Sequence, residues 1–146
     1  MVLAMGAEGI PHSAEERLAA CKLIVTHLNK YGIGEEKLYF DPLVLPISVD
    51  CVQAMTTLKT AENIKLCYPN AKTVIGLSNI SYGLPNRKLI NRAFLVMAAY
   101  TGVDAVILDP LDREVMSLIK VAEVLTGKDS QCRRYLRAHR RGMIGG

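Results

Sequence analysis

Two polar side chains, Asp41 and Asn79, are the best candidates for chemistry in this sequence. Asp41 lies in the stretch YFDPLVLPIS, where Pro42 restricts the chain directly after it and Pro46 restricts the loop further. A carboxylate fixed in this way can accept hydrogen bonds from two adjacent N–H donors, the pair that the amino-oxo pyrimidine edge of a pterin or guanine presents. The alternative is that Asp41 caps the turn that follows it.

Asn79 follows a second apolar stretch, in the segment VIGLSNISYGLPNR. An amide can donate a hydrogen bond to one atom and accept one from another without any change of charge. The alternative is an Asx turn that stabilises the loop. The two side chains together indicate binding of a neutral heterocycle.

Other reactive residue types in the chain argue against several familiar kinds of site. The three histidines, His12, His27 and His139, lie away from the expected strand ends, so a nucleophile–base pair is not indicated. Neither G-x-G-x-x-G nor G-x-x-x-x-G-K-[ST] is present, which disfavours nucleotide binding by those loops. The four cysteines contain no C-x-x-C pair, so we expect neither structural zinc nor a disulfide framework.

The candidate residues follow short β-rich runs that alternate with helical ones. The expected strands are 1–5, 38–40, 73–75 and 105–108, and the expected helices are 14–30, 49–66, 88–100, 113–125 and 130–140. Ser13 and Glu16 form a predicted capping box at the start of the first helix. The strands begin near positions 1, 37, 72 and 104, a spacing of 32 to 36 residues, which is the length of one strand–helix unit of a parallel α/β fold.

Four such units would form either a small open sheet or half of an eight-stranded barrel, since a whole barrel takes about 250 residues. Periodicity does not choose between the two architectures. Both bind ligands beyond the carboxyl ends of their strands. The polar residues directly after the strands are therefore expected to share one edge: Asp41, Ser78, Asn79 and Asp109.

The composition is that of a globular chain, with 146 residues, 50% of them hydrophobic and 22% charged. Its apolar runs fall short of the roughly 20 residues that a membrane helix needs, so we expect no membrane-spanning segment. The start, MVLAMGAEG, lacks the basic residues of a signal peptide, which makes the cytoplasm the expected location.

The positive charge of the chain is concentrated at its end. Residues 129–146 carry five arginines against Asp129, whereas residues 1–128 carry equal numbers of basic and acidic side chains. We interpret residues 1–128 as the α/β domain and 129–146 as a basic C-terminal helix and tail. No aromatic platform or base-reading motif accompanies the stretch RRYLRAHRR, so we expect a solvated helix face and no nucleic-acid partner.

Two segments, YFDPLVLPISVD and VIGLSNISYGLPNRKLINRAFLVMA, resemble corresponding segments of the corrinoid/iron–sulfur protein methyltransferases. These enzymes use methyltetrahydrofolate and belong to the pterin-binding (β/α)8 barrels. The resemblance runs from about Val2 to Thr126, with EGIPHSAEER and GVDAVILD in the expected order. It implies that the chain is the C-terminal half of such a barrel, with four parallel strand–helix units plus a terminal helix.

The resemblance also implies roles for individual residues. Asp41 matches the aspartate that binds the pyrimidine edge of the pterin, and Asn79 matches the asparagine that hydrogen-bonds the nitrogen carrying the methyl group. Gly76 and Ser78 would line the same loop, and Arg87 matches an arginine of the folate site. The implied reaction moves the methyl group of 5-methyltetrahydrofolate to the reduced cobalt of a corrinoid protein, which carries the cobalt as a partner.

Half a barrel would have two open sheet edges and an uncovered inner face. We therefore expect either a separately supplied N-terminal half or a homodimer. Three alternatives remain: a dihydropteroate synthase or another folate-dependent pterin barrel, a non-catalytic flavodoxin-like binding module, and an inert, partly folded fragment. The segment after Lys72 lacks the lysine expected of the synthase, and Tyr82 stands where the resemblance leads us to expect glutamine.

Overall fold

A computed structural model describes residues 1–144 of the chain. Its strands are β1 (Val2–Leu3), β2 (Tyr39–Asp41), β3 (Lys72–Gly76) and β4 (Ala105–Ile107). Its helices are α1 (Ala14–Asn29), α2 (Gln53–Cys67), α3 (Arg87–Tyr100), α4 (Arg113–Leu125) and α5 (Arg133–Arg140), joined by the short 3-10 turns η1 (Glu35–Lys37), η2 (Leu77–Ser81) and η3 (Ser130–Cys132). The predicted alternation of strands and helices is confirmed. Within residues 1–144, no helix is long and apolar enough to cross a membrane.

The predicted helix over 130–140 is wrong in its first turn. Gln131 and Cys132 both have φ of +55°, so the chain forms the separate turn η3 before α5 begins at Arg133. Asp129 stabilises this arrangement, because its carboxylate accepts from the backbone N–H groups of Arg134 (3.0 Å) and Tyr135 (2.9 Å). The last two residues of the predicted tail 129–146 lie outside the described part of the chain.

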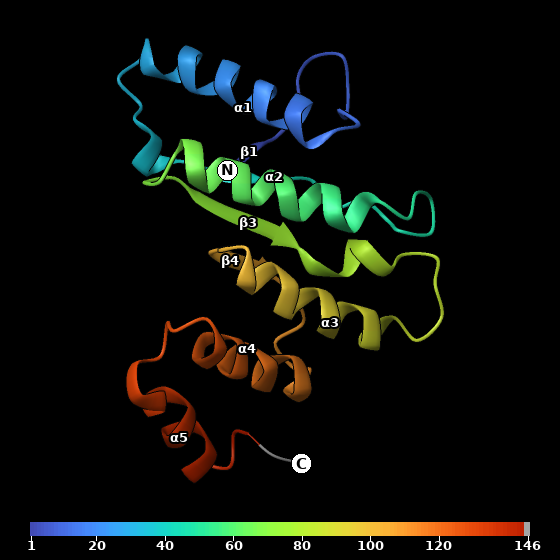
Figure 1. Ribbon diagram of the computed structural model, residues 1–146, viewed down its shortest axis with the longest axis vertical. Coiled ribbons are helices and arrows are strands. Elements are labelled where there is room, and N and C mark those ends of the chain that lie inside the picture. Colours follow the sequence, from blue (N-terminus) through green and yellow to red (C-terminus); the bar gives the residue numbers. More distant parts are fainter. Residues whose placement is uncertain (145–146) are drawn as a thin grey trace.

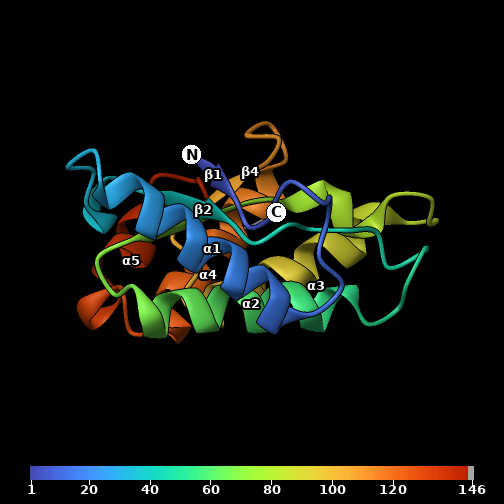
Figure 2. The ribbon, with the colours of Figure 1, turned by 90° about the horizontal axis from the view of Figure 1, so that it is seen from above.

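The four strands form one parallel sheet in the order β1-β2-β3-β4. Successive helices follow the same order along the molecule, from α1 at one end to α4 and then α5 at the other (Figure 1). Seen from above, α1 to α4 lie together on one side of the sheet (Figure 2). Each strand–helix unit therefore crosses over on the same face, as in one arc of an α/β barrel.

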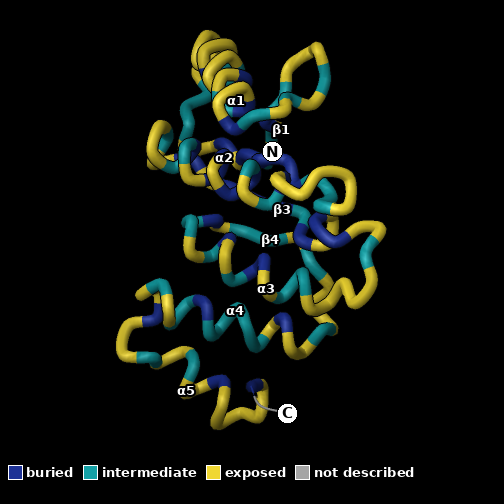
Figure 3. Tube along the Cα trace, turned by 45° about the vertical axis from the view of Figure 1, so that its right-hand side comes forward, coloured by how far each residue is buried: buried dark blue, intermediate teal, exposed yellow. Residues whose placement is uncertain are grey.

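The two faces of the sheet differ sharply in burial. Phe40, Thr73 and Ile75 point toward the helices and are fully buried. The opposite face, here called the open face, presents Leu3 (43% exposed) and Ile107 (61% exposed) at its two sides, while Val74 between them is buried. Figure 3 shows the buried segments gathered around the central strands, while α1 and α5 at the two ends are largely exposed. The uncovered inner face expected of half a barrel is present.

The core beneath the sheet consists of two apolar clusters. One surrounds β2, where the ring of Phe40 stacks on Tyr68 with centroids 5.9 Å apart and the buried Cys21 packs nearby. Burial raises the pKa of Cys21 to about 12, so this thiol stays neutral and acts as a packing residue. The second cluster joins β3 to α3 through Ile75 and Phe94. The clusters give the ends of β2 and β3 a rigid support.

The capping box predicted at α1 is confirmed and makes a test of local stability. Ser13 Oγ accepts from the N–H of Glu16 at 3.1 Å, and Glu16 Oε2 accepts from the N–H of Ser13 at 3.1 Å. Ser13→Ala leaves that first-turn N–H without its side-chain acceptor, so we expect the free energy of unfolding to fall by about 1 kcal/mol. Urea denaturation followed by circular dichroism measures this.

Ser117→Ala is the matched control for the cap. The hydroxyl of Ser117 lies within α4 and donates to the carbonyl of Arg113 at 2.8 Å, where the helix does not depend on it. We expect a change below about 0.5 kcal/mol in either direction. Equal destabilisation by the two substitutions would contradict the capping role of Ser13.

Candidate functional site

Asp41 and Gly76 end two neighbouring strands on the open face of the sheet. Asp41 is the last residue of β2 and pairs with Leu3, which points to the open face. Gly76 is the last residue of β3 and pairs with Ile107, which points the same way. Paired residues of parallel strands share a face, so both positions look into what would be the interior of a barrel at its carboxyl edge.

The amide of Asn79 folds back over the same face. Its Nδ2 lies 3.4 Å from the place that a Cβ of Gly76 would occupy. The pairing of Phe40 with Thr73 puts Gly76 two residues further along the sheet than Asp41. With about 4.8 Å between strands and about 3.3 Å per residue, the Cα atoms of Asp41 and Gly76 are about 8 Å apart. The structure thus brings Asp41, Gly76 and Asn79 together at the carboxyl edge of the open face.

The two loops that carry Asp41 and Asn79 are fastened to each other. The N–H of Ile47 donates to the carbonyl of Ile80 at 3.0 Å, and Ser48 Oγ donates to the carbonyl of Tyr82 at 2.6 Å. These bonds join the loop after β2 to the turn η2 and to Tyr82, the residue directly after it. The two loops are therefore held in a fixed position relative to each other, and a ligand between them can contact both.

Asp41 caps the turn that follows it and still has a free oxygen. Its Oδ1 accepts from the N–H of Leu43 at 2.9 Å, as in an Asx turn. Within residues 1–144 its Oδ2 forms no hydrogen bond and can serve a ligand. Burial raises the pKa of Asp41, and this effect is opposed by the Leu43 N–H and by the positive charge of Arg17.

A fully buried arginine, Arg17 of α1, lies beneath this loop and was not among the residues that the sequence singled out. Its Nη1 donates to the carbonyls of Pro42 (3.1 Å) and Leu43 (2.9 Å). Its Nη2 donates to Gln53 Oε1 at 2.7 Å, and its Nε donates to the carbonyl of Pro11 at 3.2 Å. The guanidinium therefore ties α1, α2 and the loop after β2 together.

Arg87, expected at the folate site, holds the turn η2 against the start of α3. Its Nη2 donates to the carbonyl of Ser78 at 2.7 Å, its Nε donates to Ser81 Oγ at 3.1 Å, and its guanidinium lies over the ring of Tyr82. The side chain of Ser78 is exposed. Arg87 thus fixes the loop that carries Asn79, and a direct contact with ligand stays a prediction for both Arg87 and Ser78.

The carboxyl edge continues to the loop after β4. Asp109 Oδ1 accepts from the N–H of Leu111 at 2.9 Å, which makes Asp109 a turn residue. Asp109 and Ser78 line a hollow of about 300 Å³ between η2 and α4, together with Lys88 and Asp112. Among residues 1–144, no three histidine, cysteine, aspartate or glutamate side chains come together in a way that could hold a metal ion.

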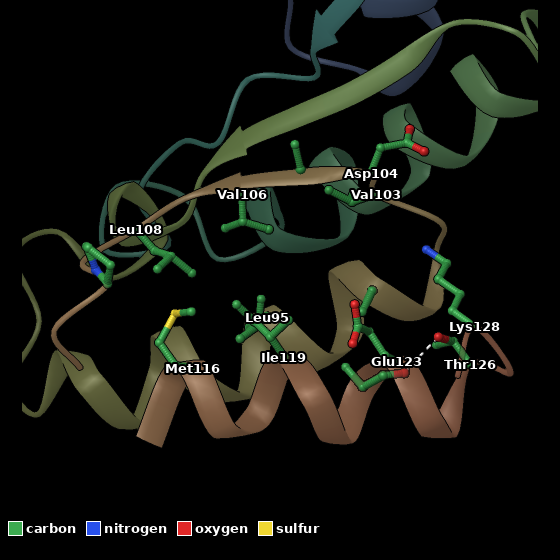
Figure 4. A pocket seen from close by; sticks show the side chains of 14 residues that line it. Leu95, Val103, Asp104, Val106, Leu108, Met116, Ile119, Glu123, Thr126 and Lys128 are labelled. Carbon is green, nitrogen blue, oxygen red and sulfur yellow. Dashed lines mark hydrogen bonds between the residues drawn. The ribbon is translucent and has the colours of Figure 1, made fainter. Parts of the chain in front are cut away.

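A second hollow, of about 460 Å³, lies between β4 and α4 at one end of the sheet. Figure 4 shows Met116 and Ile119 of α4 facing Val106 and Leu108 across it. β4 pairs with β3 on one side, and among the described residues no strand pairs with its other side. The hollow is therefore an apolar groove beside an open strand edge, the place where a further strand–helix unit of a barrel would pack.

Comparison with known proteins agrees with this geometry. Residues 9–109 match the family described as pterin binding enzyme. The match covers more than half of the chain and spans the loops of both Asp41 and Asn79. The chain belongs to this family, which favours a pterin barrel over a flavodoxin-like module.

Two curated proteins are similar in sequence to this chain. The chain is 34% identical over 137 residues to the methylcorrinoid:tetrahydrofolate methyltransferase of Eubacterium limosum, which covers 94% of this chain and 51% of that protein. It is 25% identical over 114 residues to the methionine synthase of Mycobacterium tuberculosis, which covers 73% of this chain and 10% of that protein. The chain therefore spans about half the length of the first relative and about a tenth of the second.

Proposed function

We propose that this chain carries the pterin-binding and catalytic loops of a methyltransferase that works between a tetrahydrofolate nitrogen and the cobalt of a corrinoid protein. The observation that supports this most directly is the convergence of a carboxylate, Asp41, and an amide, Asn79, on the open face at one edge of a parallel sheet. Similarity to a methylcorrinoid:tetrahydrofolate methyltransferase over nearly the whole chain supports the same reaction.

Asp41 would hold the pterin through its pyrimidine edge. That edge presents two adjacent N–H donors, and a carboxylate can accept both. The free Oδ2 of Asp41 and its position facing the open side of the sheet suit this contact. Asp41 would therefore set the orientation of the ring, and with it the place of the nitrogen that carries the methyl group.

Asn79 would stabilise the charge that develops as the methyl group moves. When the bond between the methyl carbon and the ring nitrogen breaks, its electron pair stays on the nitrogen, which is a poor leaving group until it takes a proton from solvent and becomes the N–H of tetrahydrofolate. An N–H donor held at that nitrogen stabilises the new electron pair chiefly in the transition state, so it raises turnover more than it tightens binding. The reduced cobalt of the corrinoid partner is a strong nucleophile and accepts the methyl group.

The contacts of Asp41 and Asn79 do not set the direction of methyl transfer, which depends on the free energies of the reactants and products. We propose transfer from 5-methyltetrahydrofolate to cobalt, whereas the name of the Eubacterium limosum relative describes transfer from a methylcorrinoid to tetrahydrofolate. Both directions pass through the same transition state. The amide of Asn79 lowers the barrier for each of them.

The rest of the pterin site would come from a complementary half-barrel. The open face exposes Leu3 and Ile107, the groove beside β4 is apolar, and the relative is about twice as long as the matched segment. Four further strands would cover the open face, fill the groove and pair with β1 and β4. We propose that this chain is the C-terminal half of the barrel, and that the other half is a chain similar to the part of the Eubacterium limosum relative that this chain does not match. A second copy of the chain is the competing outcome.

The test is a titration of the chain with 5-methyltetrahydrofolate by calorimetry, alone and with a complementary half taken from the Eubacterium limosum relative. Methyl transfer to and from free reduced cobalamin is then followed by absorbance. We expect folate binding and transfer in both directions from the assembled pair. Pairing of the chain with itself into an active dimer would overturn the proposed complement, and folate binding by neither form would overturn the proposed reaction.

A further inference from the structure

Arg17 is unusual because it is a fully buried charge that forms no ion pair within residues 1–144. Two other half-buried or exposed arginines, Arg92 and Arg134, pair with Asp112 and Asp129 instead. Burying a guanidinium is unfavourable unless its donors are satisfied. All of its hydrogen bonds go to neutral oxygens, two of them on the loop that follows Asp41.

We propose that Arg17 is a positioning residue that holds the loop after β2, and with it the Asp41 carboxylate, in the geometry that binds the pterin. This inference rests on the proposed function of Asp41. Three features of the loop support it: the backbone at Leu43, the hydrogen bonds that converge there, and the electrostatic effect of Arg17 on Asp41.

Leu43 adopts a conformation that a leucine rarely takes, with φ of +66°. Its carbonyl accepts from both Arg17 Nη1 and Thr57 Oγ1, each at 2.9 Å, and its N–H donates to Asp41 Oδ1. The two donors hold the carbonyl, and the same residue's N–H holds the carboxylate. Loss of Arg17 would allow Leu43 to relax and would release Asp41 from its present orientation.

Arg17 also acts on Asp41 through its charge. Burial raises the pKa of Asp41, and the positive charge of Arg17 opposes that rise. Tyr39 and Lys72 lie further toward the amino edge of the open face, and Asp50, in the loop after β2, is held by Gln53 Nε2 at 2.8 Å. Arg17 therefore combines a geometric effect with an electrostatic one.

The test compares Arg17→Met and Arg17→Lys in the ligand-free chain by NMR. Selective labelling gives the titration of the Asp41 carboxylate and the exchange rate of the Leu43 amide. We expect Arg17→Met to raise the titration midpoint of Asp41 and to speed exchange at Leu43 at least about tenfold relative to the core amides. Arg17→Lys keeps the charge but not the planar fork, so the midpoint should recover more than the exchange rate does.

Arg92→Met is the matched control, because Arg92 is also packed against its neighbours but lies on α3 with Asp112 as its partner. It should leave both readouts at Asp41 and Leu43 unchanged. If Arg17→Met does not fold, Gln53→Leu replaces it, since it removes the acceptor of Arg17 Nη2, and it should speed Leu43 exchange in the same direction. A folded Arg17 or Gln53 variant with unaltered Asp41 titration and Leu43 exchange would overturn the inference.

Folate affinity separates this inference from the proposed function. In the assembled barrel, Asp41→Asn tests whether the carboxylate binds folate at all. If Asp41→Asn leaves the affinity unchanged, the proposed function of Asp41 fails, while the ligand-free measurements still report on Arg17. If affinity depends on Asp41 but Arg17→Met binds folate as tightly as the natural sequence, the positioning role of Arg17 is overturned.

Discussion

Replacement of Asn79 by alanine is expected to lower kcat for methyl transfer about 30- to 1000-fold, which corresponds to about 2 to 4 kcal/mol of transition-state stabilisation. The dissociation constant of folate should change by less than about threefold, because the amide N–H strengthens its contact only as charge develops. Asn79 is exposed, and within residues 1–144 its side chain forms no hydrogen bond, so its removal should leave the fold intact.

Single-turnover methyl transfer by the assembled barrel, with calorimetry for binding, measures the two effects separately. Asn63→Ala is a suitable control, because Asn63 is an asparagine of α2 outside the carboxyl-edge loops. It should leave both kcat and the dissociation constant within about twofold of the natural sequence. Equal losses in binding and in turnover after Asn79→Ala would show that the amide binds the ground state, and an unchanged kcat would remove it from the mechanism.

The elements of the fold could be predicted where local signals agree with the packing. The helix expected over 113–125 is found with those bounds, since Asp112 accepts from the N–H groups of Glu114 and Val115 and an apolar stripe follows. The helix expected from about Val49 starts instead at Gln53, after Asp50 Oδ1 accepts from the N–H of Val52 in a turn. Element ends depend on such side-chain contacts, which periodicity does not register.

Part of the candidate site could likewise be predicted from the sequence and part of it could not. The positions of Asp41 and Asn79 follow from the rule that polar residues after parallel strands share one edge, and the structure places both there. The role of Arg17 could not be predicted, because its partners Pro42 and Gln53 are 25 and 36 residues away in the chain. One signal was present: Arg17 interrupts the apolar stripe of its helix, which is an uncommon place for a charge.

Replacement of Asp41 by asparagine should weaken folate binding about 30- to 1000-fold, because two charge-assisted hydrogen bonds worth about 1.5 to 3 kcal/mol each are lost or reduced. Asparagine keeps an oxygen for the N–H of Leu43, so the turn at that residue is retained. Turnover at saturating folate should fall much less than affinity. Calorimetry of the assembled barrel measures the loss, and an unchanged dissociation constant would exclude Asp41 from the pterin site.

The pH dependence of binding follows from the environment of Asp41. Burial raises the pKa of Asp41 in the folded chain, because burial favours the neutral carboxylic acid. The contribution of Asp41 to the stability of the fold is therefore fully present below the unfolded pKa and is lost as pH rises through the folded pKa. The pterin edge requires the ionised carboxylate, so folate binding should weaken as pH falls through a range above that of an ordinary aspartate. The side chain in Asp41→Asn has no carboxyl group to titrate. Folate affinity is therefore measured at each pH for this variant and for the natural sequence, and the difference between the two removes any effect of folate's own ionisation. A difference that stays constant across the acidic range would show that the carboxylate does not contact the ligand.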